Sequence, residues 1–328
     1  MPSAFNIVAV LQEGRLQYEA LLLAASWAAS HPDPDDRPAL IFAEPQPGPA
    51  WNHDPRVKDE ALRARIEELG AEIRPFENLV FGSRYPHGNK IFALTCLPAG
   101  APFLFLDTDT IIRAPLTKLT FDRPTASMRR EDTWPSIEVY GPGYTETWRA
   151  LYERFGLDFA SSLDLTQPDE YWERYLYFNA GWFLGADPHQ FADHFSHYAA
   201  EIERRPGKEL EGQSLDPWLD QVALPLVIHA LGGGRPEGEA KRLDDALTCH
   251  YRTFPLLYAR EADEVIALVE ALASVQKNKK FLREYEPIKA MVYGGKGAKA
   301  RALFDRENLP KREAGFRKRL KEKNLWMR

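Results

Sequence analysis

The sequence predicts an α/β fold, with a Rossmann-like mixed sheet flanked by helices and followed by a basic helical tail. Three observations support this fold class. Short apolar segments alternate with helical segments over about the first hundred residues. One apolar segment, residues 102–106, ends directly at two aspartates, and the balance of charge changes sign near residue 276. We therefore expect a nucleotide-binding half, an acidic site at the edge of its sheet and an extension of different character.

The segments of the first half, residues 1–115, predict strands joined by helices. Apolar and β-branched runs predict the strands, and apolar residues at helical spacing predict the helices. Because a helix follows each strand, we expect parallel strands joined by right-handed crossovers. The predicted strands are residues 5–11, 39–43, 71–76 and 102–106, and the predicted helices are residues 15–30, 57–69 and 89–97. No GxGxxG motif follows the first strand, so a dinucleotide-binding domain loses its main support.

Residues 116–275 are expected to form a second half, so that residues 1–275 make one domain. The run Asn179-Ala180-Gly181 interrupts an apolar strand, which indicates a bulge or the close approach of a ligand. The predicted strands are residues 125–130, the end of 171–184 and 246–252, and the predicted helices are residues 146–155, 188–203, 216–231 and 261–275.

A basic extension, residues 276–328, follows this domain. Residues 277–328 hold 17 Lys and Arg against 6 Asp and Glu, although the whole chain has a net charge of −6. The acidic remainder disfavours binding to nucleic acid. Phe316, Leu320 and Trp326 give the extension an amphipathic pattern, which suits a helix lying on an anionic membrane surface or, alternatively, a solvated helix.

The remaining composition indicates a cytoplasmic protein, able to lie peripherally at the inner face of a membrane. No stretch reaches 18 apolar residues, and no basic segment precedes the short apolar run at the N-terminus. Cys96 and Cys249 are far apart in the sequence and have no metal-like spacing, so we expect two buried thiols.

The acidic pair is the strongest chemical signal. In an extended segment Asp107 and Asp109 point to the same side, and two like charges so close are stabilised by a divalent cation. A hard cation held by few carboxylates, Mn²⁺ or Mg²⁺, is how nucleotide phosphates are usually bound. The alternative is that both aspartates merely cap a surface turn.

Three separated segments, followed by the histidine of TCHYR, resemble the GT-A glycosyltransferases, nearest to the family 8 group of retaining enzymes. The segments are KIFALTCLPAGAPFLFLDTDTIIRAPL, YFNAGWFL and DQVALPL. The resemblance implies a metal site of Asp107, Asp109 and His250 that holds Mn²⁺ or Mg²⁺. It also implies a nucleotide-sugar donor, with a UDP-sugar favoured. Residues 1–275 would then be the catalytic domain, with residues 116–275 as the half that binds the sugar and the acceptor.

The donor is expected to contact Lys90, Gln12 and Lys296 as well as the acidic pair. Lys90 offers a compact positive charge on the helix before the acidic pair, Gln12 follows the first strand, and Lys296 lies in the glycine-rich run MVYGGKGAK. Lys90 also has an ordinary interpretation as a solvated helix lysine, and His250 as a core or surface histidine.

Asp220 and Gln221 are the expected catalytic residues. Asp220 can bond sugar hydroxyls or stabilise positive charge on the sugar, and the Gln221 amide is suited to orientation because it is a poor nucleophile. Asn179, Gly181 and Asp220 are expected to contact the sugar or the acceptor. Asp220 also has an ordinary interpretation, as an acid favoured at a helix N-terminus.

We therefore predict a metal-dependent glycosyltransferase, of hexosyltransferase type, that uses a nucleoside diphosphate sugar. The acceptor is a glycan, a lipid-linked molecule or another hydroxyl compound. One alternative is a nucleotidyltransferase of related fold, which needs a glycine-rich basic loop after the first strand, where LQEGR is a weak candidate. The other alternative is a GT-A-like domain that binds nucleotide or glycan without turnover.

Overall fold

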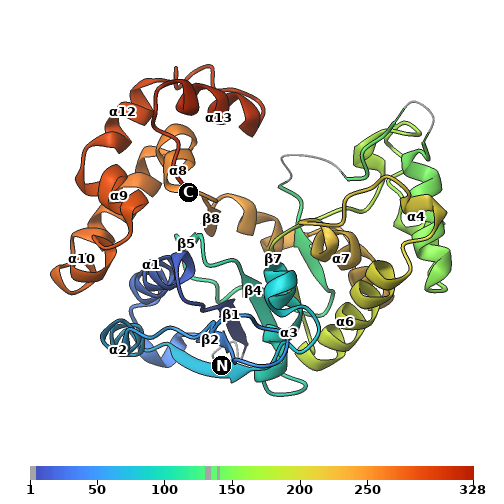
Figure 1. Cartoon of the computed structure of the whole chain (residues 1–328), viewed down its shortest axis with the longest axis horizontal. Helices are drawn as coiled ribbons and strands as arrows, with labels where there is room; N and C mark the ends of the chain where they lie inside the picture. The colour runs from blue at the N-terminus through green and yellow to red at the C-terminus, as the bar shows by residue number, and fades with distance from the viewer. Residues whose placement is uncertain (1–4, 130–133, 139–140) are drawn as a thin grey trace.

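The structure, a computed structural model, describes residues 5–129, 134–138 and 141–328. Figure 1 shows a sheet flanked by helices, with the helices of the C-terminal extension gathered on one side of it. The strand predicted at residues 125–130 reaches into the part of the chain outside these ranges, and its described part is strand β6.

The central sheet has six strands in the order β3-β2-β1-β4-β7-β6. β1 pairs in parallel with β2 and β4, and β2 pairs in parallel with β3. β7 is antiparallel to both of its neighbours, β4 and β6. This arrangement confirms the predicted mixed sheet. The strands are β1 Asn6–Val10, β2 Ala39–Pro45, β3 Glu72–Phe76, β4 Phe103–Leu106, β6 Thr125–Ser127 and β7 Asn179–Gly185.

The helices largely follow the predicted segments, although the one expected at residues 89–97 is a short α-helix continued by a 3₁₀ turn over Ala93–Cys96. Aspartates precede three of the α-helices, since Asp59, Asp158 and Asp187 accept hydrogen bonds from backbone N–H groups of the first turn. The helices are α1 Arg15–Ser30, α2 Glu60–Glu68, α3 Asn89–Phe92, α4 Tyr144–Arg154, α5 Phe159–Ser162, α6 Pro188–Arg204, α7 Leu219–Ala230, α8 Phe254–Arg260, α9 Asp263–Ser274, α10 Gln276–Leu282, α11 Glu286–Ile288, α12 Lys296–Ala302 and α13 Glu313–Glu322.

The sheet divides the hydrophobic core into two layers. Along β4, Leu104 and Leu106 belong to one layer, and Phe103 and Phe105 belong to the other, because successive side chains of a strand point to opposite faces. All four side chains are buried. The uninterrupted apolar run at 102–106 is therefore explained by a strand that is covered on both faces.

A second, two-stranded sheet follows the acidic pair directly. Its strands are β5 Thr110–Ile112 and β8 Thr248–His250, which pair antiparallel with Thr110 opposite His250. We predicted β8 but not β5. This small sheet joins the end of the first half to a segment about 140 residues later in the chain.

The extension packs into the core layer that also contains Leu104. Its side chains Phe281, Leu282, Phe316 and Leu320 are buried there. This packing accounts for the amphipathic pattern of the extension, because the apolar residues face the protein interior. In the ranges that the structure describes, no helix is both long and apolar enough to cross a membrane.

Leu320→Ala tests this packing. Since Leu320 is fully buried, the substitution should lower the free energy of unfolding of the whole chain by about 2–5 kcal/mol. The exposed neighbour Lys318 is the control, and Lys318→Ala should change stability by less than about 0.5 kcal/mol. Urea unfolding followed by circular dichroism measures both. An unchanged midpoint for Leu320→Ala would show that the extension contributes nothing to the core.

Candidate active site

A cavity of about 520 Å³ opens at the edge of the sheet where β1 and β4 end. Two predicted site residues do not line it. Lys296 lies at the start of α12, and Gly181 lies against His250, which is itself a lining residue. The other eight predicted site residues line the cavity: Gln12, Lys90, Asp107, Asp109, Asn179, Asp220, Gln221 and His250.

Strand directions explain why these residues meet. The parallel strands β1 and β4 end at the same edge of the sheet, which places Gln12 and Asp107 there. β7 runs the other way and pairs Trp182 with Leu106, so its first residues lie at that edge too. The backbone N–H of Asp107 donates to the carbonyl of Gly181 at 2.8 Å.

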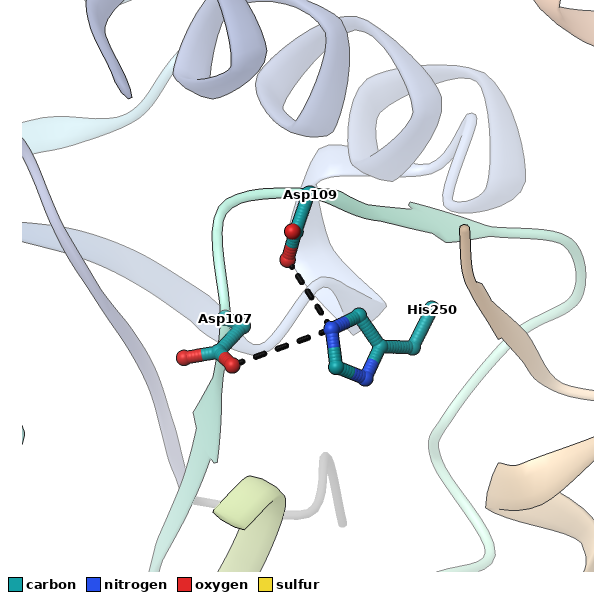
Figure 2. A group of neighbouring side chains, drawn as sticks. All are labelled: Asp107, Asp109 and His250. Carbon is teal, nitrogen blue, oxygen red and sulfur yellow. Dashed lines mark ion pairs between the residues drawn. The ribbon is translucent and has the colours of Figure 1, made fainter. Parts of the chain in front are cut away.

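The pairing of β5 with β8 brings His250 to the acidic pair. Thr110 lies opposite His250, and the N–H of Tyr251 donates to the carbonyl of Asp109 at 3.0 Å. Figure 2 shows the result, with His250 Nε2 at 3.0 Å from Asp109 Oδ1 and 3.7 Å from Asp107 Oδ2. Side chains from two distant parts of the sequence, the acidic pair and His250, therefore face one point.

Gly181 leaves room for the imidazole. A Cβ atom added to Gly181 would lie 2.2 Å from His250 Nδ1 and 2.9 Å from Asn179 Oδ1. The Asn179 side chain is itself fixed, since its Oδ1 accepts the N–H of Gly181 at 2.7 Å. Glycine is therefore required here so that the histidine ring can lie against β7, a contact that the sequence did not reveal.

Asp107, Asp109 and His250 fit a divalent cation. Each offers one ligand atom, and these atoms all lie within 4.8 Å of one another. Two carboxylates and an imidazole are suitable donors for Mn²⁺ or Mg²⁺.

The two carboxyls of the pair differ in the direction of their pKa shifts. Burial and the like charge of Asp109 raise the pKa of Asp107 even though Lys90 opposes them, whereas interaction with His250 outweighs burial and lowers the pKa of Asp109.

Lys90 connects the acidic pair to Asp220. Its Nζ lies 2.9 Å from the Asp107 carboxylate and 3.5 Å from Asp220 Oδ2, and it donates to the carbonyl of Ala180 at 3.1 Å. Burial alone would lower the pKa of Lys90, but the two carboxylates outweigh it and the pKa is raised. Lys90 is therefore a partly buried charge partner of two carboxylates, with 14% of its side chain exposed, and the interpretation as a solvated helix lysine is wrong.

Asp220 is held firmly on its other side. The Tyr85 hydroxyl donates to Asp220 Oδ1 at 2.8 Å, and the N–H of Asp220 donates to the same hydroxyl at 3.0 Å. Burial and the charge of Asp220 raise the pKa of Tyr85, so the phenol stays a proton donor. Gln221 is fixed in a similar way, because its Oε1 accepts the Tyr177 hydroxyl at 3.2 Å.

Several cavity residues were not predicted. Asn89 supports Gln12, with its Nδ2 donating to Gln12 Oε1 at 3.0 Å. Four arginines also line the cavity, and the extension supplies two of them: Arg15, Arg252, Arg317 and Arg328. Arg15 stood in the LQEGR segment that we weighed for a different function. For the arginines of the extension there was no motif to find, because only tertiary packing brings them here.

The fold and the site agree with the class that the motifs predicted, a GT-A-like glycosyltransferase. The chain belongs to the family described as the Rhodobacterales glycosyltransferase domain, whose sequence model matches residues 7–232. This membership confirms that the protein is a glycosyltransferase enzyme.

Solved structures give a looser likeness. The galactosyltransferase LgtC, solved with donor and acceptor sugar analogues, has a TM-score of 0.45 and 15% identity, covering 84% of this chain and 99% of its own. The glycosyltransferase GlyE of Streptococcus pneumoniae TIGR4 has a TM-score of 0.42 and 15% identity, covering 86% of this chain and 64% of its own. The bifunctional WbbM also has a TM-score of 0.42, with 14% identity, covering 84% of this chain and 45% of its own. A search of curated protein sequences found no match.

Gly181→Ala tests the geometry of the acidic site. The new methyl group must displace His250, so the affinity for Mn²⁺ should fall at least about tenfold while the fold is kept. The matched control is Gly48→Ala, since the nearest atom to its new methyl group is 3.8 Å away. Isothermal titration with MnCl₂ measures both variants. Equal affinity in Gly181→Ala and the wild type would mean that His250 is not a ligand.

Proposed function

We propose that the protein is a metal-dependent glycosyltransferase that moves a hexosyl group from a nucleoside diphosphate sugar, with a UDP-sugar favoured, to a hydroxyl of a glycan or a lipid-linked acceptor. The observation that carries the proposal is the convergence of Asp107, Asp109 and His250 in one cavity that also contains Asp220 and Gln221. Family membership supports glycosyl transfer, and the cavity supports the donor class.

The chemistry of the transfer suits these residues. Breaking the bond between the anomeric carbon and the diphosphate oxygen builds negative charge on the leaving group and positive charge on the sugar. When a divalent cation is bound by Asp107, Asp109 and His250, it acts as a Lewis acid that stabilises the departing diphosphate. Lys90 places a fixed positive charge beside the same carboxylates.

We assign contact with the sugar to Asp220. It is 1% exposed and lies between Lys90 and Tyr85, so its position is fixed before the substrate arrives. A fixed carboxylate can bond sugar hydroxyls and stabilise the positive charge that develops at the anomeric carbon. Gln221, next to it in the chain and anchored by Tyr177, offers an amide for orienting the ring.

The first test is titration with UDP-, GDP- and CDP-sugars. With MnCl₂ present at least one of them should bind, and after addition of EDTA its affinity should fall at least about tenfold, because the carboxylates then repel the diphosphate. Isothermal titration measures both conditions. Binding of none of them in the presence of Mn²⁺ would refute the proposed donor class.

Two isosteric variants separate metal binding from turnover. Asp109→Asn should lose both Mn²⁺ affinity and donor hydrolysis, whereas Asp220→Asn should keep Mn²⁺ affinity and lose about 10²–10³-fold in hydrolysis rate. Asp193→Asn, on the exposed side of α6, is the control and should match the wild type. Release of nucleoside diphosphate measures the rates. Rates equal to wild type in both site variants would favour a binding domain without turnover.

A further inference from the structure

We propose that the C-terminal extension completes the donor site, because the arginines it brings to the cavity form, together with Arg15 and Arg252, an anion subsite for the diphosphate of the donor. The inference rests on the proposed function, since that function places a nucleoside diphosphate in this cavity. It assigns two arginines of the extension, Arg317 and Arg328, to substrate binding, whereas its sequence suited either a membrane surface or a solvated helix.

The end of the extension lies at the cavity. Arg317 on α13 and two residues beyond it, Trp326 and Arg328, line the same space as Asp107 and Asp109. In Figure 1 the chain runs through α13 and returns to end near α8 and β8, close to the strand that carries His250. Residues far apart in the sequence therefore share one wall of the cavity.

A buried glutamate holds this wall in place. Glu313 at the start of α13 is 4% exposed, and it pairs with Arg252 at 3.4 Å, with Arg260 at 3.6 Å and with Arg317. The Arg317 guanidinium also lies over the ring of Trp326, at 5.4 Å from its centroid. Several guanidinium groups share one carboxylate, so the wall keeps a net positive charge.

The backbone at Arg252 is consistent with a site. Arg252 follows His250 by two residues and has φ of +64°, a left-handed conformation that residues other than glycine rarely adopt. Such a conformation persists only where the surrounding structure enforces it, and it is common at ligand-binding positions. The Arg252 side chain lines the cavity and pairs with Glu313 of the extension.

Arg15 supplies the remaining charge. It begins α1, lies 3.4 Å from the buried carboxylate of Glu19, and keeps 30% of its side chain exposed. The cavity thus presents an acidic group that fits a divalent cation and four guanidinium groups. A diphosphate is the part of the donor that needs both, because guanidinium groups bind phosphate oxygens through pairs of charge-assisted hydrogen bonds. A neutral sugar needs neither.

The test compares two double variants by titration with UDP, GDP and CDP in MnCl₂ at fixed ionic strength. Arg317→Ala with Arg328→Ala should weaken binding of the preferred nucleotide at least about tenfold, as expected when charged hydrogen bonds are lost. Lys318→Ala with Lys323→Ala removes the same charge from the same segment, at residues that do not line the cavity, and should stay within about twofold of the wild type. Arg317→Gln, which keeps much of the side-chain stem, should weaken binding in the same direction as the arginine pair.

The outcomes separate the two proposals. If the wild type binds no nucleoside diphosphate, the proposed function falls and this inference falls with it. If the wild type binds one and the arginine pair binds it as tightly as the lysine pair does, only this inference is overturned. The inference would also be overturned if the arginine pair kept the nucleotide affinity of the wild type but no longer sedimented with phosphatidylglycerol vesicles. That result would assign the two arginines to a membrane surface.

Discussion

The charge balance of two neighbouring carboxylates, Asp109 buried and Asp107 partly buried, is the constraint on which the site depends. Asp107 and Asp109 end a strand whose other residues are fully surrounded by apolar side chains, so their charges need partners close at hand. The protein supplies Lys90 on one side and His250 on the other. Lys90 then reaches Asp220, which extends the same network to the residue proposed to contact the sugar.

The surrounding architecture can be understood from this requirement. Antiparallel addition of β7 brings a glycine beneath the histidine, and the pairing of β5 with β8 carries the histidine across a long sequence separation. The extension then adds positive charge to the same cavity through α13 and the segment after it. We therefore expect donor binding to be coupled to the packing of the extension, because Glu313 forms ion pairs with both Arg252 and Arg317.

Much of the fold was predictable because its signals are local. The apolar run at 102–106 predicts a buried strand, and the apolar spacing at 15–30 predicts a helix. The two aspartates after the strand indicate a cation site, and the resemblance to known enzymes led to His250. β5 was missed because three residues after a turn carry no periodic pattern. The need for glycine at 181 and the packing of the extension depend on tertiary contacts, which no local pattern reveals. The apolar residues of the extension, whose pattern also suited a membrane surface, face the core. Lys296 looked suitable in sequence but lies outside the cavity lining.

We propose that Asp107, Asp109 and His250 hold a divalent cation where the donor diphosphate binds. Anomalous diffraction from crystals containing MnCl₂ and UDP tests it most directly. The account predicts an anomalous peak in the cavity, bonded to Asp109 and His250 and adjacent to Asp107, with the diphosphate beside it. A nucleotide bound without such a peak, or a peak away from His250, would contradict the account.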